Sequence, residues 1–270
     1  MTGFLTRRVF LLLGAGLLVA LFATPVAVLL GRAATSGALG DIARSPVVIE
    51  ALRLSLVTTF ISLAITVGLG TPLAYLLARR RTRLTALAEV LVDLPLVLPP
   101  SVAGLGLLLV FGRRGLIGES LDAAGLAIPF TTIAVVLAQV FVAAPFYVRA
   151  ARAAIGGVSR DLEDAARVDG ASELRVFVEV TLALARPGIS AGLVMSWARS
   201  LGEFGATILF AGNVLGRTQT LPLVVYAEFQ AGDLDAAIAA AAVLVLAAIG
   251  VLIAVRLARS GRPLDAAAAT

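Results

Sequence analysis

The stretch Ser159–Thr181, SRDLEDAARVDGASELRVFVEVT, is charged and helix-prone, and it lies between two long apolar segments. Ser159 is a good N-cap, because its side-chain oxygen can accept a hydrogen bond from a free amide of the first helical turn. Acidic residues follow it, where the helix dipole favours negative charge. Gly170 can adopt the left-handed conformation that ends a helix, and Ser172 can begin a second short helix. From the pattern alone, a surface hairpin without a partner and a docking element are equally compatible.

Composition places this stretch in a membrane protein. The chain has 270 residues, 60% of them hydrophobic, and a mean hydropathy of +1.01. A soluble domain of this size does not need that much apolar surface, so an integral membrane protein is the default expectation. The absence of Cys and His removes thiolate chemistry and the commonest general base and metal ligand. We therefore expect no catalytic residue and no metal site.

Six apolar segments have roughly the 20 residues that a membrane-spanning helix requires. The first follows Arg7-Arg8, which resembles a twin-arginine export signal, but its length favours an uncleaved span. In the third, Leu98-Pro99-Pro100 must break or kink the helix, and the fourth contains Pro145. We expect an all-α integral membrane protein with a single transmembrane domain over residues 1–270 and spans near 9–30, 54–78, 90–111, 131–151, 187–210 and 236–255.

Arginine sets the expected orientation, since every basic residue is Arg and cytoplasmic segments carry the excess of positive charge. With the N-terminus inside, 15 arginines fall in inner segments and six in outer ones, while Arg199 lies within the fifth span. Both termini and the loop 159–181 are then cytoplasmic. The outer segments are too short to fold alone as a ligand-binding domain, so substrate capture in solution would need a separate protein. Topology explains these arginines better than nucleic-acid binding does.

The fifth span carries ionisable groups, which are costly in a membrane and deserve a functional hypothesis. Arg199 and Glu203 are four residues apart, so they share a helix face and can pair. Small residues recur at every fourth position, and such a stripe lets helices approach closely. A packing face with a neutralised ion pair and a face that lines a shared conduit both stay open. The small residues are Gly188, Gly192, Ser196 and Ser200.

The loop 159–181 resembles the cytoplasmic motif of ABC-importer permeases, which reads Glu-Ala-Ala, three residues, Gly, nine residues, Ile-x-Leu-Pro. Asp164 stands here for the Glu and Ala183 for the Pro, and the spacing through Gly170 to Leu182 is the same. In that family the loop is a short coupling helix that docks on the ATPase subunit. The resemblance implies the ABC-importer permease fold and an ATPase-coupling role for Asp164, Ala165, Ala166, Gly170 and Ala171.

A second resemblance narrows the family. Residues 198–207, ARSLGEFGAT, are very similar to the corresponding segment of molybdate-importer permeases, and Leu98–Pro100, Phe111–Gly115 and Thr218–Pro222 resemble that subfamily too. It implies a permease subunit of an ATP-driven importer of molybdate or tungstate in a prokaryotic plasma membrane. Two permease copies would form a conduit lined largely by the third and fifth spans. A path role is carried over as a hypothesis to Arg199, Ser200, Glu203 and Thr207.

The same resemblance implies the partners: a second copy of the chain, two ATPase subunits, membrane lipid and an extracytoplasmic oxyanion-binding protein. The chain has no Lys, which a P-loop needs to reach nucleotide phosphates, so ATP and Mg²⁺ would be used by the partner ATPase and no cofactor is expected here.

Other functions are weaker alternatives. Sulfate or thiosulfate permeases share the Gly-Glu-Phe-Gly-Ala core and are the main alternative for the cargo. An intramembrane enzyme could use Glu89 and Asp93 to hold Mg²⁺, but no second acidic cluster accompanies them. A passive channel has no need for the loop 159–181. We therefore expect a transporter subunit and not an enzyme.

Overall fold

The computed structural model describes residues 2–260, without the side chains of some residues near either end, and that part of the chain contains helices and no strands. Residues 1 and 261–270 of the predicted domain lie outside the described residues. The elements are α1 (Thr2–Thr35), α2 (Ala38–Ala43), α3 (Pro46–Arg79), α4 (Arg83–Val97), α5 (Pro100–Phe111), α6 (Gly118–Ala123), α7 (Thr132–Gly156), α8 (Arg160–Val168), α9 (Glu173–Arg175), the π-helical turn η1 (Val176–Thr181), α10 (Leu182–Leu201), α11 (Gly205–Phe210), α12 (Leu221–Gln230) and α13 (Leu234–Ser260).

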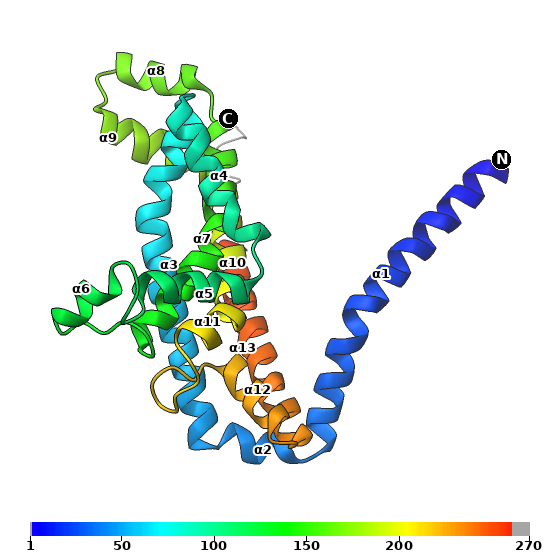
Figure 1. Ribbon diagram of the computed structural model, residues 1–270. Helices are drawn as coiled ribbons and strands as arrows, with labels where there is room; N and C mark the ends of the chain where they lie inside the picture. The colour runs from blue at the N-terminus through cyan, green and yellow to red at the C-terminus, as the bar shows by residue number, and fades with distance from the viewer. Residues whose placement is uncertain (1, 261–270) are drawn as a thin grey trace.

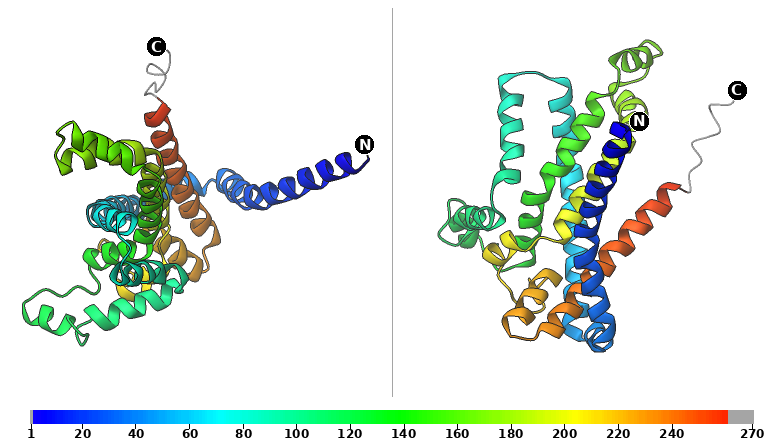
Figure 2. Two further views of the ribbon diagram at one scale, coloured as in Figure 1. Left: turned by 90° about the horizontal axis from the view of Figure 1, so that it is seen from above. Right: turned by 90° about the vertical axis from the view of Figure 1, so that its right-hand side faces the viewer.

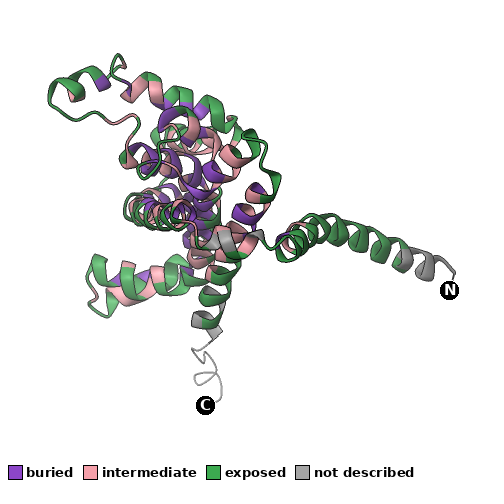
Figure 3. Ribbon diagram, turned by 90° about the horizontal axis from the view of Figure 1, so that it is seen from below, coloured by how far each residue is buried: buried purple, intermediate pink, exposed green. Residues whose placement is uncertain are grey.

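The long helices α3, α7 and α10 form the centre of the molecule, and α13 packs beside α12 and α2 (Figure 1). Helices α8 and α9 lie at one end, and α2 and α12 lie at the other. Helix α1 extends away from the remaining helices (Figures 1 and 2) and is exposed along most of its described length (Figure 3). Five described helices are long and apolar enough to cross a membrane, or six if the bent pair α4–α5 is one span.

Close contact between α7 and α10 holds the centre together. A Cβ built on Gly188 would lie 2.5 Å from the Cβ of Ala154, and one on Gly192 would lie 2.7 Å from the Cβ of Ala150. Ser196 completes the contact by donating to the carbonyl oxygen of Ala143 at 3.0 Å. The small-residue stripe of the fifth span is therefore a packing face toward α7 of the same chain, and this part of it does not meet a second copy.

The third predicted span, 90–111, is broken at its prolines, as expected from Leu98-Pro99-Pro100. Helix α4 ends at Val97, α5 begins at Pro100, and their axes differ by 119°. Leu98 takes the extended conformation that a following proline favours, and Pro100 occupies the first turn of α5, where its missing amide costs nothing. The bend lays α5 against α7 and α11, where Ala103 and Ala206 belong to one buried cluster.

The helix that corresponds to the fifth predicted span, near 187–210, begins and ends earlier than that range. The helix runs without a break from Glu173 through η1 to Leu201, and α11 follows after a turn. The second short helix that was expected after Ser172 is therefore the first turn of a long one. By contrast, α7 continues through Pro145 as a single helix. Since α9 and α10 are continuous, the loop 159–181 is joined to the fifth span by helix and not by flexible chain.

Candidate coupling and transport sites

Local sequence builds the helical hairpin as expected. The Ser159 side chain accepts from the amide of Asp161 at 3.2 Å and caps α8. Gly170 ends that helix with a φ of 88°, a conformation that strains any residue with a Cβ. The Ser172 side chain then caps α9 by accepting from the amide of Arg175. The predicted caps and the glycine turn are confirmed.

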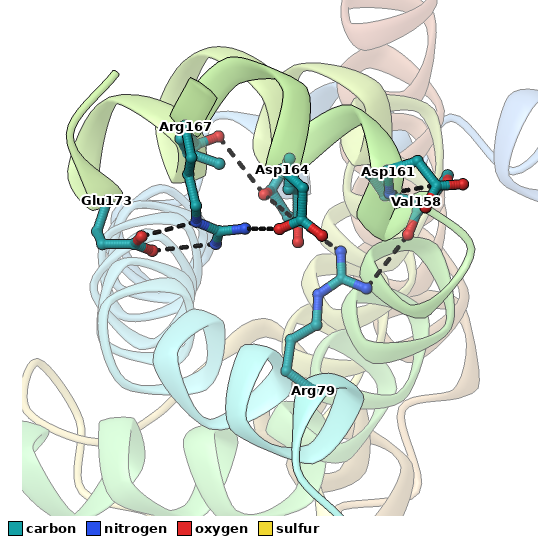
Figure 4. Close-up of polar contacts among 10 residues, drawn as sticks. Arg79, Val158, Asp161, Asp164, Arg167 and Glu173 are labelled. Atoms are coloured by element: carbon teal, nitrogen blue, oxygen red, sulfur yellow. Dashed lines mark hydrogen bonds and ion pairs between the residues drawn. The ribbon is translucent and has the colours of Figure 1, made fainter. Parts of the chain in front are cut away.

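A buried ion pair fastens α8 to the helices beneath it. Glu163 is only 3% exposed, and its Oε1 lies 2.5 Å from Nη2 of Arg79 at the end of α3. The hydroxyl of Thr181 in η1 donates to the same oxygen at 2.6 Å. Arg79 also donates to the carbonyl oxygen of Val158 at 3.2 Å (Figure 4). In the sequence, Glu163 is one of several acids that the helix dipole favours near the start of α8, and spacing does not tell which of them faces inward.

The predicted coupling residues lie on the outer face of the hairpin. Asp164, Ala165 and Gly170 are exposed, whereas Ala166 and Ala171 are half-buried. Arg167 joins the two arms of the hairpin, since it bonds Glu173 at 2.7 Å and Asp164 at 2.6 Å (Figure 4). The hydrogen bonds that Arg167 donates, first to Glu173 and then to Asp164, raise the pKa of Arg167 above its ordinary value. The motif therefore forms a pre-shaped, accessible surface.

In the fifth span the predicted ion pair is present: Arg199 Nη2 lies 2.6 Å from Glu203 Oε2. Glu203 stands just past the end of α10, and its other oxygen accepts from the amide of Ala206 at 2.7 Å, which caps α11. Ser200, Glu203 and Thr207 are each at most 2% exposed, and 27% of the Arg199 side chain is accessible. Of the four predicted path residues, Arg199 alone is partly exposed, so the path role stays a prediction.

A row of hydroxyl groups on α3 faces the same region. These residues are not among the sites predicted from the sequence. Gln139 of α7 donates to Thr58 and Thr59 at 3.2 and 3.4 Å, and the Ser62 hydroxyl lies 3.4 Å from that of Ser200. The available signal was the spacing of three to four residues between hydroxyls in an apolar span, which places them on one helix face. The row consists of Ser55, Thr58, Thr59, Ser62 and Thr66, all of them buried.

A comparison with known protein families covers both the hairpin of α8 and α9 and the fifth span. Residues 70–261 match the family described as the binding-protein-dependent transport system inner membrane component. The chain belongs to this family. The family assignment confirms that the chain is a transport component and not an enzyme, as the loop motif predicts.

Relatives and structures agree with that family. The chain is 48% identical over 205 residues to the molybdenum transport system permease protein ModB of Mycobacterium tuberculosis, covering 76% of this chain and 77% of the relative. It is 43% identical over 216 residues to ModB of Escherichia coli K12, covering 79% and 94%. A bacterial ABC transporter that imports alginate superposes with a TM-score of 0.71 at 19% identity, over 94% of this chain and 95% of that chain. The permease fold predicted from the sequence is confirmed.

Proposed function

We propose that this chain is the membrane permease subunit of an ATP-driven importer of molybdate. The observation that carries the proposal is the 48% identity to a molybdenum transport permease over 205 residues. The sulfate or thiosulfate alternative receives no support from these relatives. Tungstate has the charge and shape of molybdate, so it is the second candidate cargo, and the preference between the two is left to experiment.

The partners follow from what the chain exposes and what it lacks. The outer face of the hairpin, with Asp164, Ala165 and Gly170 accessible, is the proposed docking surface for an ATPase subunit. The chain has no Lys with which to build a P-loop, so that subunit would use the ATP and Mg²⁺. A second copy of this chain would complete the conduit, and an extracytoplasmic oxyanion-binding protein would deliver the cargo. We place the assembly in a prokaryotic plasma membrane.

Orientation is the second part of the proposal. The end of the molecule that carries α8 and α9 also carries the arginines that follow α3 and those near the end of α7 (Figure 1). Positive residues are retained on the cytoplasmic side, so this end faces the cytoplasm and both termini do as well. The ATPase surface is then on the side where ATP is present.

Two connections would carry motion from the hairpin into the membrane. Glu163 links α8 to Arg79, and therefore to α3. The unbroken helix from Glu173 to Leu201 links α9 to Arg199. A partly exposed arginine attracts a dianion, and its partner Glu203 limits how tightly the dianion is held. Ser200 and Thr207, predicted to join this path, are buried here and would have to be uncovered by a conformational change.

Uptake of labelled molybdate tests the proposal, in proteoliposomes that contain the permease, its ATPase and its binding protein. We expect uptake that requires ATP hydrolysis, resists excess sulfate and falls when tungstate competes. An ATPase whose P-loop lysine is replaced serves as the control. Uptake abolished by sulfate would move the cargo to sulfate, and uptake without ATP would contradict an ABC importer.

A further inference from the structure

A basic groove lies beside the hairpin of α8 and α9, at the end of the molecule proposed to face the cytoplasm (Figure 1). Its first part is a cavity of about 920 Å³ between the end of α3, the start of α4 and the end of α7. Its second part is a cavity of about 580 Å³ that reaches the start of α8. The two cavities share Ala78, Arg81 and Gly156, so they form one continuous groove.

The wall of the groove carries charge of one sign. Seven arginines line it, against the single carboxylate of Glu89. Positive residues are retained on cytoplasmic segments, but that rule does not gather them around one groove. A cleft lined by one sign of charge focuses the electrostatic field and favours a partner of the opposite charge. The arginines are Arg79, Arg80, Arg81, Arg83, Arg149, Arg152 and Arg160.

Only part of this charge is neutralised within the chain. Ion pairs with the chain's own carboxylates involve three of the seven arginines, Arg79, Arg149 and Arg152. In the part of the chain that the structure describes, the other four form no salt bridge, and all four are exposed. They are Arg80, Arg81, Arg83 and Arg160. Their guanidinium groups are therefore available to carboxylates outside the chain.

The groove continues the surface proposed for the ATPase. Arg160 is the first residue of α8, and the exposed Asp164 follows four residues later, so the two lie on one face of that helix. The rise between them is about 6 Å along the helix axis. A subunit that covers Asp164 is therefore close enough to reach the groove as well.

Size and exposure favour a protein over a small anion as the occupant. The uncompensated arginines are exposed, and the groove is much larger than one tetrahedral oxyanion, so nothing fixes such an ion in place. Carboxylates of a folded partner are positioned by that partner's own structure. Several charge pairs that form together set the orientation of the two proteins and raise the rate at which they associate.

We propose that the groove is a second docking surface for the ATPase subunit, and that it receives an acidic segment of that subunit beside the hairpin. The inference rests on the proposed function, since it names a further contact of the proposed partner. The groove is built on α3, α4 and α7, whereas the hairpin continues into α10. An ATPase held at both surfaces would therefore contact the third span as well as the fifth.

The absence of Lys makes this contact directly testable. Arg81→Lys keeps the positive charge and introduces the only side-chain amine of the chain, which a zero-length carbodiimide joins to a neighbouring carboxylate as an amide. The permease–ATPase complex would be treated in nanodiscs that contain phosphatidylserine. We expect mass spectrometry to identify an amide between the introduced lysine and an Asp or Glu of the ATPase. Arg186→Lys is the matched control, because Arg186 is exposed near the start of α10 and lines neither cavity.

The affinity of the purified permease for its ATPase measures what the groove contributes. We expect Arg80→Gln/Arg81→Gln/Arg83→Gln to weaken ATPase binding at least tenfold at low salt. Binding should also depend less on salt than in the wild type, because ions screen charge pairs at a surface. The control Arg44→Gln/Arg113→Gln/Arg114→Gln removes the same charge from exposed arginines outside the groove and should bind like the wild type. Size-exclusion profiles and melting temperatures verify that both variants fold.

Four results would overturn the groove as a docking surface. Equal yields of amide from Arg81→Lys and Arg186→Lys would reduce the reaction to crowding. Coupling of Arg81→Lys to phosphatidylserine in place of the ATPase would make the groove a site for lipid headgroups. Equal loss of affinity in the two triple variants would reduce the effect to overall charge. Wild-type affinity in the groove variant, with uptake intact, would leave the hairpin as the docking surface and contradict the groove alone. A complex that joins through the groove but does not import molybdate would contradict the proposed function alone.

Discussion

Glu163 shows how much a single residue depends on the rest of the fold. Its side chain is 4% exposed and that of Arg79 is 12% exposed, so both charges are largely removed from water. Removing one partner of such a pair leaves an unpaired buried charge and typically costs about 3–5 kcal/mol. The pair also receives the Thr181 hydroxyl, so three segments of the chain meet at one carboxylate oxygen.

Glu163→Ala is therefore expected to lower the stability of the purified permease by about 3 kcal/mol and to separate ATP hydrolysis from uptake. Glu163→Gln retains an oxygen that can accept from both partners, so its effect should be smaller. Thermal unfolding measures the loss of stability, and parallel assays of ATP hydrolysis and uptake measure how well the two are coupled.

Glu173→Ala is the matched control, because it breaks another Arg–Glu pair of the hairpin whose carboxylate side chain is 74% exposed. Exposed ion pairs contribute at most about 1 kcal/mol to the free energy of unfolding. If Glu173→Ala and Glu163→Ala behave alike, burial of the pair is irrelevant and the anchoring role is excluded.

Glu203 pairs with Arg199 and also accepts a hydrogen bond from the amide of Ala206. Two substitutions can separate these roles. Glu203→Ala removes the cap from α11 and leaves Arg199 unpaired, so we expect reduced uptake and a loss of about 3 kcal/mol in stability. Glu203→Gln keeps an acceptor for the Ala206 amide but removes the charge. It should preserve stability better and retain the cargo more tightly, as measured by the time course of labelled molybdate release. Unchanged uptake and assembly of Glu203→Ala would speak against any role.

At the scale of elements, the hairpin of α8 and α9 depends on one backbone conformation. No atom outside its immediate neighbours lies within 4 Å of a Cβ built on Gly170, so space is not limiting there, whereas its φ of 88° disfavours a side chain. The strain of the left-handed conformation is about 1–2 kcal/mol, and more for a β-branched residue. The turn, and with it the angle between the two helices, is what a substitution would change.

Gly170→Val is expected to uncouple ATP hydrolysis from uptake while membrane insertion stays intact. Gly232→Val is the control, because Gly232 has a φ of 84° and equally open surroundings in the turn between α12 and α13. Both variants carry the same strain, and only the first disturbs the hairpin. ATPase activity per imported molybdate is the quantity to compare. Loss of the Gly170→Val protein from the membrane would instead assign the turn a folding role.

The bend between α4 and α5 is also a property of elements. Two consecutive prolines end one helix and begin the next, so sequence alone predicts a break. The angle of 119° is set by the surface that α5 finds on α7 and α11. The same applies to the end of α10, where Glu203 stabilises the turn by capping α11.

For the whole molecule, orientation is the testable property, and the absence of Cys makes it accessible. A cysteine introduced as Val168→Cys, at a position 87% exposed in α8, should react with a membrane-impermeant maleimide only after cells are opened. Leu116→Cys, at a position 88% exposed between α5 and α6, should react in intact cells. The reverse labelling pattern would invert the topology and remove the ATPase surface from the cytoplasm.

The sequence by itself determined the membrane class, the helical caps of the loop 159–181 and the family, because these depend on composition, on contacts between near neighbours and on motif spacing. It also predicted the pair of Arg199 and Glu203, which lie one helical turn apart. Only the tertiary structure decided that Glu163 faces Arg79, that the stripe from Gly188 packs on α7 of the same chain, and that the third span folds back at Leu98. These features join residues far apart in the chain, and their geometry follows from which surfaces fit together.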